Sequence, residues 1–371
     1  MISLFFLGFI ILTLLWNLYY AGHWHKNLMV TFRFLQNFVY AGDQAEMTEQ
    51  IENRKRLVLP VLEVAFHVDM NLALHDCVNT NVSDFIYKRD IFALLGNQRI
   101  TRKLTLNCAH RGYYRIEKSY LTSISMLHRK FYSIEFPTDA ELYVYAARIN
   151  VSDILVTCER LIGSVQCAKR LLEDPFAYAS IREYTITDPM KTINWKASAR
   201  TGDLMVNTFE STRMENIMIF LDVEDSGILK YEYLTEYAIS VAASRARKMI
   251  ARGMAVGLYT NIISDPHLSH TYLVPSSGKK QLSDIEHLLA IHKASSDTTP
   301  FSSILDSFTG QTEECVLIFI SKNTLQNQPV IETFVNREQQ AVWIVPHPAT
   351  ETCDLHPAHN IHLIERGVYD T

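Results

Sequence analysis

The sequence predicts a multidomain protein in which an apolar N-terminal helix precedes an antiparallel, β-sandwich-like domain and a doubly wound α/β domain. Three observations predict this order. Residues 2–21 form an uncharged apolar run, residues 27–170 contain short alternating segments, and residues after 213 alternate apolar strands with a helical pattern. A chain of 371 residues is also longer than chains that usually fold around a single hydrophobic core.

The N-terminal run is long enough to cross a membrane. Residues 2–21 read ISLFFLGFIILTLLWNLYYA and contain no charged side chain. About 20 such residues, each rising about 1.5 Å, span the roughly 30 Å hydrocarbon layer. A cleaved signal peptide and a buried core helix are the alternatives. Because nothing basic precedes a long apolar core, a retained single-pass transmembrane helix that contacts membrane lipid is favoured.

The charges beside this run predict its orientation. Lys26 and Arg33 follow it, and no charged side chain precedes it. Lysine and arginine are retained on the cytoplasmic side, so the body is expected to be cytoplasmic and fixed to the cytoplasmic (inner) membrane. Six cysteines without a Cys-x-x-Cys pair are too few for a disulfide scaffold, which fits a reducing compartment.

Residues 27–170 have the period-two alternation of strands with one buried face. Residues 57–66, 103–108 and 141–146 are examples. We expect a small antiparallel domain built like a sandwich. The basic triplet at residues 54–56 is interpreted as part of a solvated loop, with contact to anionic lipid as the alternative.

After residue 213 the pattern changes to strand, helix, strand. Residues 216–222 (NIMIFLD) are an apolar run ending in an acid, which is typical of a strand buried on both faces of a parallel sheet. Apolar residues then recur at spacings of three and four from Leu234 to Met249. Together with strands at 254–259, 314–320 and 341–345 and a helix at 281–291, this pattern predicts a doubly wound α/β domain over residues 213–371.

Residues 171–212 link the two domains and contain a dense motif. Residues 181–200 read IREYTITDPMKTINWKASAR, and residues 201–210 read TGDLMVNTFE. The order of an Arg-x-Tyr, an acidic turn, an Ile-x-Trp-Lys, an Ala-Arg and a Leu-x-Val resembles the family called domain of unknown function 58. The residues that fit this pattern are Arg182, Tyr184, Asp188, Ile193, Trp195, Lys196, Ala199, Arg200, Leu204 and Val206.

The resemblance implies a bacterial, membrane-anchored protein that ends in a von Willebrand factor A-like domain. It also covers the Arg-Gly-Tyr-Tyr at residues 111–114. Members are commonly encoded beside MoxR-type AAA+ ATPases, so the resemblance implies such an ATPase as a protein partner and a role in maturing client complexes. Two departures matter: members often have two membrane helices, and Asn194 stands where histidine is common. The expected function is protein interaction or assembly at the membrane, without catalysis.

The motif admits two physical interpretations. In the first, Trp195 is an interdomain anchor buried against the α/β sheet, and Arg200 pairs with Asp188 or Glu210. This interpretation is favoured because tryptophan is highly buried on average and a buried arginine needs a partner. In the second, Trp195 and the neighbouring cations form a surface that binds a partner protein.

A metal site is the other candidate. Von Willebrand A domains that bind Mg²⁺ resemble one another in an Asp-x-Ser-x-Ser after the first strand, joined by a threonine and a second aspartate. Asp222 and Ser226 fit, but Glu224 replaces the middle serine and the later aspartate is missing. The threonine has a candidate at 298–299. We expect no cofactor, with Mg²⁺ on the incomplete set of Asp222, Glu224, Asp225 and Ser226 as the alternative.

Other functions have less support. A net charge of -5 gives no basic field for nucleic acid. No Gly-x-Ser-x-Gly, P-loop or dinucleotide fingerprint occurs. The remaining alternatives to an assembly factor are an ion-dependent adhesion module on the outer side of the membrane and a hydrolase built from distant residues such as Asp188, His356 and His359.

Overall fold

The computed structural model contains two compact units. Unit 1 comprises residues 1–148 and 286–293, and unit 2 comprises residues 149–285 and 294–371. The structure describes residues 2–74, 80–82, 85–125, 130–149, 178–186, 188, 190–209, 216–224, 231–263, 271–292, 298–308, 315–322, 327–337, 341–348 and 361–366.

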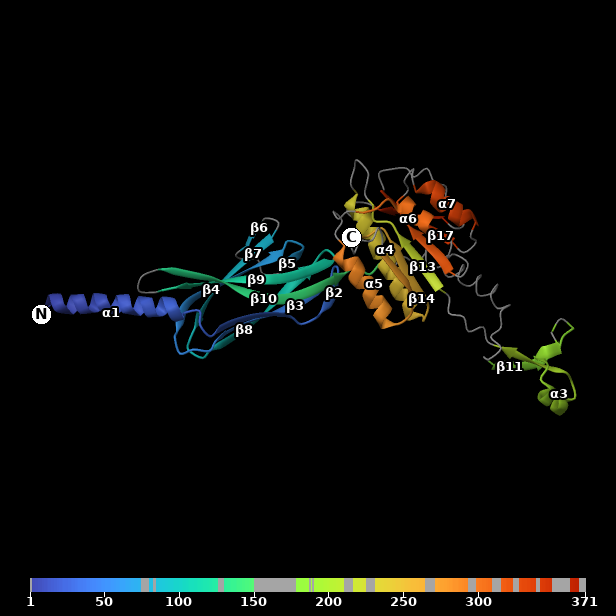
Figure 1. The fold of residues 1–371 in the computed structure, drawn as a ribbon, viewed down its shortest axis with the longest axis horizontal. Helices are drawn as coiled ribbons and strands as arrows, with labels where there is room; N and C mark the ends of the chain where they lie inside the picture. The colour runs from blue at the N-terminus through green and yellow to red at the C-terminus, as the bar shows by residue number, and fades with distance from the viewer. Residues whose placement is uncertain are drawn as a thin grey trace. The chain divides into compact units, whose positions relative to one another are not determined.

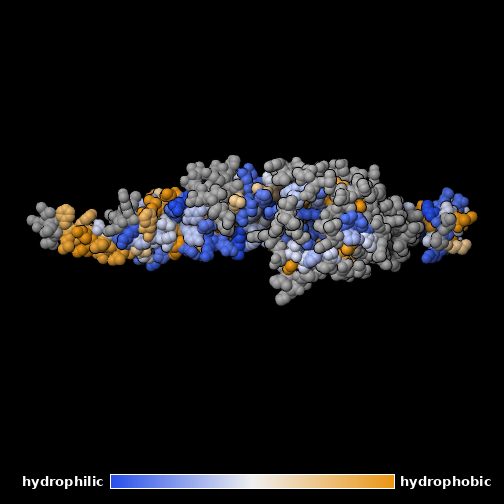
Figure 2. All heavy atoms as spheres, turned by 90° about the horizontal axis from the view of Figure 1, so that it is seen from above, coloured by the Kyte–Doolittle hydropathy of each residue, from blue (hydrophilic) through white to orange (hydrophobic). Residues whose placement is uncertain are grey.

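Unit 1 begins with helix α1, Ile2–His23, which contains the predicted apolar run. Among the described helices, α1 alone is long and apolar enough to cross a membrane, over Phe5–His23. Large apolar side chains along most of its length are exposed, and they form the apolar surface at the N-terminus in Figure 2. Such a surface matches a hydrocarbon environment.

The rest of unit 1 is rich in strands that form two sheets. One sheet has the order β1-β3-β8-β5, and the other β2-β10-β9-β4-β7-β6 (Figure 1). Neighbouring strands run antiparallel except β2 and β10, which are parallel. The bounds are β1 Leu28–Phe34, β2 Phe38–Tyr40, β3 Gln44–Asn53, β4 Leu59–Asp69, β5 Leu72–Leu74, β6 Thr80–Val82, β7 Phe85–Leu94, β8 Arg99–Cys108, β9 Gly112–Ile124 and β10 Phe131–Tyr145.

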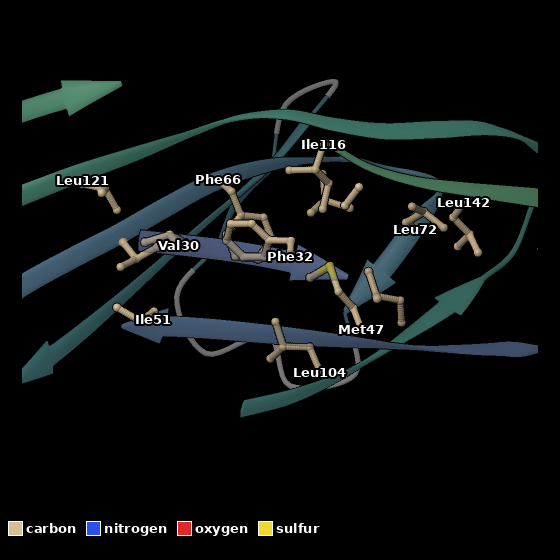
Figure 3. Close-up of a cluster of buried hydrophobic side chains, with 14 of the residues drawn as sticks. Val30, Phe32, Met47, Ile51, Phe66, Leu72, Leu104, Ile116, Leu121 and Leu142 are labelled. Carbon is tan, nitrogen blue, oxygen red and sulfur yellow. The ribbon is translucent and has the colours of Figure 1, made fainter. Parts of the chain in front are cut away.

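The core of unit 1 lies where side chains from both sheets meet. Strand β3 alternates buried and less buried positions along its length, as a strand with one face on a core does. Phe32 of β1 and Phe66 of β4 have ring centroids 4.7 Å apart, and Met47 and Leu104 lie in the same cluster (Figure 3). The predicted sandwich-like β region is therefore present.

Residues 286–293 cluster with unit 1 through the Arg-Gly-Tyr-Tyr segment. The buried Arg111 guanidinium donates to the carbonyl oxygens of Leu289, at 2.5 Å, and His292, at 2.7 Å. A cation is favourable beside carbonyl groups at the end of a helix because those groups carry partial negative charge.

Unit 2 contains a six-stranded sheet with the order β15-β14-β13-β16-β17-β18. All neighbours are parallel except β15, which runs antiparallel to β14. The strand bounds are β13 Asn216–Leu221, β14 Ala255–Thr260, β15 Thr271–Ser276, β16 Cys315–Ile320, β17 Ala341–Pro348 and β18 Ile361–Arg366. The helices are α4 Glu232–Ala251, α5 Lys279–Ile291, α6 Phe301–Ser307 and α7 Gln328–Arg337, of which the last residues of α5 belong to unit 1.

Helices cover both faces of this sheet. Phe220, Phe319 and Trp343 point to one face and pack with Phe301 of α6 and Ile331 of α7. Helix α4 packs against β13, β14 and β17 with a largely buried face. Strands buried on both faces explain the continuous apolar runs in the sequence.

Candidate functional site

The dense motif folds into a small strand-helix-strand arrangement within unit 2. It comprises β11 Tyr178–Glu183, the short 3-10 helix η1 Met190–Thr192, helix α3 Trp195–Thr201 and β12 Met205–Phe209. Strands β11 and β12 pair antiparallel, with Arg182 opposite Val206. Figure 1 shows α3 beside this hairpin. The motif is therefore an ordered element with its own hydrogen bonds.

Helix α3 is capped at both ends. At the N-cap, Asn194 Oδ1 accepts a hydrogen bond from the Ala197 amide at 3.0 Å, and its Nδ2 donates to Asn207 Oδ1 at 2.7 Å. At the other end, Gly202 has a φ of 86° and its N–H donates to the Ser198 carbonyl. Asparagine is a good N-cap residue and glycine the usual left-handed C-cap residue. The departure at residue 194 thus still supplies a cap.

A serine hydroxyl fastens α3 to β12. Ser198 Oγ donates to the Asn194 carbonyl at 2.9 Å and accepts from the Met205 amide at 2.8 Å. Ile193, just before the helix, forms a bridge to Val206, and both side chains are buried. The position of α3 on the hairpin is therefore fixed at several points.

The acidic turn is fastened to β11 by a bidentate ion pair. Both Arg182 Nη atoms donate to the Asp188 carboxylate, at 2.6 and 2.7 Å. The Thr185 amide and hydroxyl donate to the same carboxylate at 2.8 and 2.7 Å. The hydrogen bonds from Arg182, followed by those from Thr185, hold the pKa of Asp188 well below its usual range. Asp188 is thus an acceptor that organises the turn.

The structure corrects the expectation that Trp195 is buried. Its side chain is 68% exposed. Of the two partners expected for Arg200, Asp188 pairs with Arg182 instead, and Glu210 lies outside the described residues. The physical reason lies in helix geometry: Trp195 is the first residue of α3, and the hairpin packs against Ile193 before it.

The exposed surface of α3 combines an aromatic ring with cations. Trp195, Lys196, Ala199 and Arg200 are all exposed. Residues four apart on a helix are neighbours, so these side chains form one continuous patch, named here the α3 patch. Tyr184 is only half-buried and lies in the hairpin, where its amide donates to the Leu204 carbonyl at 2.8 Å.

The second candidate, Asp222, lies at the carboxyl end of β13. It is 4% exposed, and three N–H groups donate to it. Oδ1 accepts from the Glu224 amide and from Asn261 Nδ2, and Oδ2 accepts from Asn327 Nδ2, all at 2.9 Å. Burial raises the pKa of Asp222 to about 7, and the Glu224 carboxylate adds to the rise.

These donors do not fit a Mg²⁺ site. Asn261 Oδ1 accepts from the Val223 amide at 2.9 Å, and because a backbone N–H only donates, the amide group of Asn261 must turn its Nδ2 toward Asp222. Both carboxylate oxygens of Asp222 therefore face N–H groups, where a cation needs oxygen ligands. Glu224 Oε2 accepts from the Phe301 amide at 3.2 Å.

We predict that divalent metal does not stabilise the protein. A ligand adds RT ln(1 + [L]/Kd) to stability, and a carboxylate already held by N–H donors leaves Kd high. Thermal melts in millimolar Mg²⁺ or Mn²⁺ should coincide with melts in chelator. An upward shift that Asp222→Ala abolishes would contradict this prediction and restore the metal site.

Most of the other predicted site residues cannot be placed relative to Asp222 or Asp188 from the described part of the chain. Ser226, Asp225, His356 and His359 lie outside the described residues, while Thr299 contributes its carbonyl oxygen to Asn261 Nδ2 at 3.2 Å. Within the described ranges, no group of three or more His, Cys, Asp or Glu side chains is arranged to hold a metal ion.

Sequence reasoning missed the residues that hold both sites in place. Asn261 and Asn327 lie 39 and 105 residues from Asp222 and belong to no recognisable spacing. A weak signal existed for Asn261, since it directly follows the apolar strand β14, whose carboxyl end meets that of β13. Ser198, in contrast, looks like an ordinary helix residue in the sequence.

Solved structures resemble parts of the chain only distantly. The CARDB domain of the PF1109 protein from Pyrococcus furiosus, crystallised with di-metal ions, has a TM-score of 0.20 at 14% identity over 30% of this chain and 90% of that one. A non-cellulosomal cohesin from Archaeoglobus fulgidus has a TM-score of 0.23 at 10% identity, over 34% of this chain and 96% of that one. The PapD-like domain 7 of human CEP192 has a TM-score of 0.20 at 10% identity, over 32% of this chain and 87% of that one.

Two sequence comparisons match parts of the chain. The uncharacterized protein YeaD of Bacillus subtilis (strain 168) is 32% identical over 80 residues, which cover 22% of this chain and 19% of YeaD. The match thus spans about a fifth of that relative's length. The model of the family described as protein of unknown function DUF58 matches residues 180–338, from the hairpin of the α3 patch through helix α7.

Proposed function

We propose that this chain is a membrane-anchored protein-interaction or assembly factor that works with a MoxR-type AAA+ ATPase on client complexes. The observation that carries the proposal is the α3 patch. An ordered helix presents an exposed tryptophan flanked by Lys196 and Arg200. Exposed tryptophan and arginine are the residue types that dominate binding energy at protein interfaces.

The fixed position of α3 favours binding over catalysis. The caps and the Ser198 contacts hold the helix before any partner arrives, so less side-chain and backbone freedom is lost on binding. The patch is complementary to a partner surface that has an apolar pocket bordered by carboxylates. Its charged groups are the two cations Lys196 and Arg200, with no Ser, Cys, His or carboxylate side chain among its members, which is why an interaction surface describes it better than an active site.

Two further features support the remaining parts of the proposal. The sheet order of unit 2, with one antiparallel strand at β15, supports a von Willebrand factor A-like fold for that unit. Helix α1 supports a single-pass anchor, and Lys26 and Arg33 support a cytoplasmic body at the inner membrane. The ATPase itself is inferred from the resemblance to the family.

Capture of the ATPase tests the proposal directly. The full chain, solubilised in mild detergent and immobilised, is exposed to a purified MoxR-type ATPase from the same genome with ATP, with ADP or without nucleotide. We expect saturable binding that depends on the nucleotide state. Absence of binding in all three conditions, with an ATPase that still hydrolyses ATP, would contradict the partner assignment.

A further inference from the structure

The C-terminal part of helix α1 belongs to the folded body of unit 1. Tyr20 and Trp24 are buried in the same core cluster as the strands, and Asn17 is also buried. Strand β1 begins at Leu28, only a few residues after the helix ends. The helix and the β region therefore move as one body, because no linker separates them.

The β9–β10 hairpin lies alongside the last turns of α1. Tyr132 Oη donates to Asn17 Oδ1 at 2.9 Å, and the Tyr20 and Ser123 hydroxyls are 2.6 Å apart. Ser123 and Tyr132 are opposite one another in the hairpin, so one face of its end contacts the helix. Figure 1 shows β9 and β10 extending toward α1.

The β3–β4 turn lies beside the helix end as well. The Arg54 amide donates to the Asn27 carbonyl at 2.9 Å. Asn53 Nδ2 ties this turn to the β7–β8 turn by donating to the carbonyl oxygens of Leu57 and Leu95, each at 2.9 Å. The two turns are therefore held as a unit next to the point where the chain leaves α1.

This turn unit is cationic. Arg54, Lys55 and Arg56 follow one another, and Arg54 shares the Glu52 carboxylate with Arg99. The Lys55 ammonium is shielded from solvent, and no described atom accepts a hydrogen bond from it. Burial lowers the pKa of Lys55 to about 8, so an anionic acceptor at this position would be favourable.

Exposed apolar side chains accompany these cations. Phe131, at the start of β10, is 70% exposed, and Leu95, in the β7–β8 turn, is 63% exposed. The membrane-proximal face is defined here as Arg54, Lys55, Arg56, Leu95, Lys130 and Phe131. Cations mixed with apolar and aromatic side chains match the headgroup region of a bilayer.

The depth of the helix contact places this face at the membrane surface. If residues 2–21 fill the hydrocarbon layer, Asn17 lies about 6 Å inside its edge, from a rise of about 1.5 Å per residue. The headgroup region beyond that edge is roughly 5–7 Å thick. A hairpin that bonds to Asn17 must therefore reach the headgroups.

We propose that the membrane-proximal face binds the headgroups of anionic phospholipids in the leaflet that α1 leaves. The proposal rests on the membrane anchoring in the proposed function. Continuity with α1 argues for lipid as the occupant, because any protein bound at this face would have to replace headgroups at that depth. The face then sets how the rest of unit 1 stands on the membrane.

Site-directed fluorescence quenching tests this placement in the full chain. Bimane is attached to Lys130→Cys, Leu95→Cys or, as the matched control, Asp43→Cys, which lies at the far end of β3. Cys108 is replaced by alanine, because its amide donates to the Asp43 carbonyl and its thiol would lie beside the introduced Cys at 43. The other cysteines are replaced by serine. The proteins are reconstituted into phosphatidylcholine–phosphatidylglycerol vesicles that contain a nitroxide-headgroup lipid.

We expect strong quenching at residues 130 and 95 and little at residue 43. Quenching at residue 95 should be at least about twofold stronger when the nitroxide is on phosphatidylglycerol than on phosphatidylcholine, because lysine and arginine side chains near the bilayer attract anionic headgroups. Arg54→Gln/Lys55→Gln/Arg56→Gln should abolish this preference, whereas Lys103→Gln/Lys118→Gln should keep it.

The outcomes separate the two proposals. Extraction of the chain from the vesicles by alkaline carbonate would overturn membrane anchoring and this inference with it. Retention in the bilayer with equal, weak quenching at residues 130, 95 and 43 would overturn this inference alone. Equal quenching by both nitroxide lipids in the unmodified turn would overturn the assignment to anionic lipid.

Discussion

Trp195→Ala is expected to weaken capture of the ATPase by about 2 kcal/mol or more, roughly 30-fold in Kd, while the melting temperature stays unchanged. The side chain is 68% exposed and lies on a helix whose caps and Ser198 contacts do not involve the indole. Truncation thus removes a contact surface and leaves the fold intact. Titration calorimetry, or equilibrium binding to the immobilised chain, measures the affinity.

Two variants calibrate this result. Val274→Ala removes an exposed apolar side chain from the edge strand β15 and should leave both capture and stability unchanged. Ile193→Ala removes a buried side chain of the motif and is expected to cost about 2–5 kcal/mol of local stability, so its loss of binding follows loss of structure. Amide exchange of the β11–β12 hairpin distinguishes the two cases.

The charged part of the α3 patch has a separate effect. Lys196→Glu and Arg200→Glu should each leave stability within about ±0.5 kcal/mol, as exposed substitutions usually do. Both substitutions should slow association with the ATPase, and the association rate should then depend less on salt concentration. A marked fall in melting temperature for each of Trp195→Ala and Arg200→Glu would instead support the first interpretation, in which Trp195 is a buried interdomain anchor.

The sequence was informative where a pattern is local. The uncharged run at residues 2–21 lies within α1, and the apolar runs after residue 213 correspond to β13, β14, β16 and β17. The spacing of apolar residues along a segment depends on which of its faces are buried. This spacing can therefore be recognised from residues that are close together in the sequence. The alternation in residues 27–170 likewise predicted strands with one face on a core.

Contacts between distant residues were not predictable in the same way. Trp195 was expected to be buried because tryptophan usually is, but its position at the first turn of α3 exposes it. The buried Asn17 and Tyr20 read as part of a uniform lipid-facing helix, and only their hydrogen bonds to the β9–β10 hairpin show otherwise. Such contacts depend on the tertiary fold.

The amide groups around Asp222 illustrate the same limit. An Asp-x-Glu-Asp-Ser segment after a strand suggests oxygen ligands, yet the carboxylate is held by N–H donors from Asn261 and Asn327. Asparagine offers both an oxygen and an NH₂ group, and only the Val223 amide decides which of the two faces Asp222.

Asp222→Asn is expected to change strongly how stability depends on pH. Burial raises the pKa of Asp222 to about 7, above the unfolded value near 3.8. A raised pKa means that the folded state prefers the protonated form. The contribution of this group to stability is therefore fully present below about pH 3.8 and is lost as the pH rises toward 7.

The magnitude follows from the width of that window. Each pKa unit is worth about 1.4 kcal/mol, so the stability of the unmodified chain relative to Asp222→Asn should fall by on the order of 4 kcal/mol between pH 4 and pH 8. Chemical denaturation in detergent at several pH values measures this difference. Asp203→Asn, in an exposed loop, controls for the loss of one negative charge.

The sign of the slope is the decisive result. If hydrogen bonds from Asn261, Asn327 and the Glu224 amide outweighed burial, the folded state would prefer the carboxylate, and the stability of the unmodified chain relative to Asp222→Asn would rise with pH. A rising or flat difference would therefore contradict the raised pKa. A falling difference that levels off above pH 7 would show that an uncharged Asp222 is the preferred form in the sheet, which a cation-binding aspartate is not.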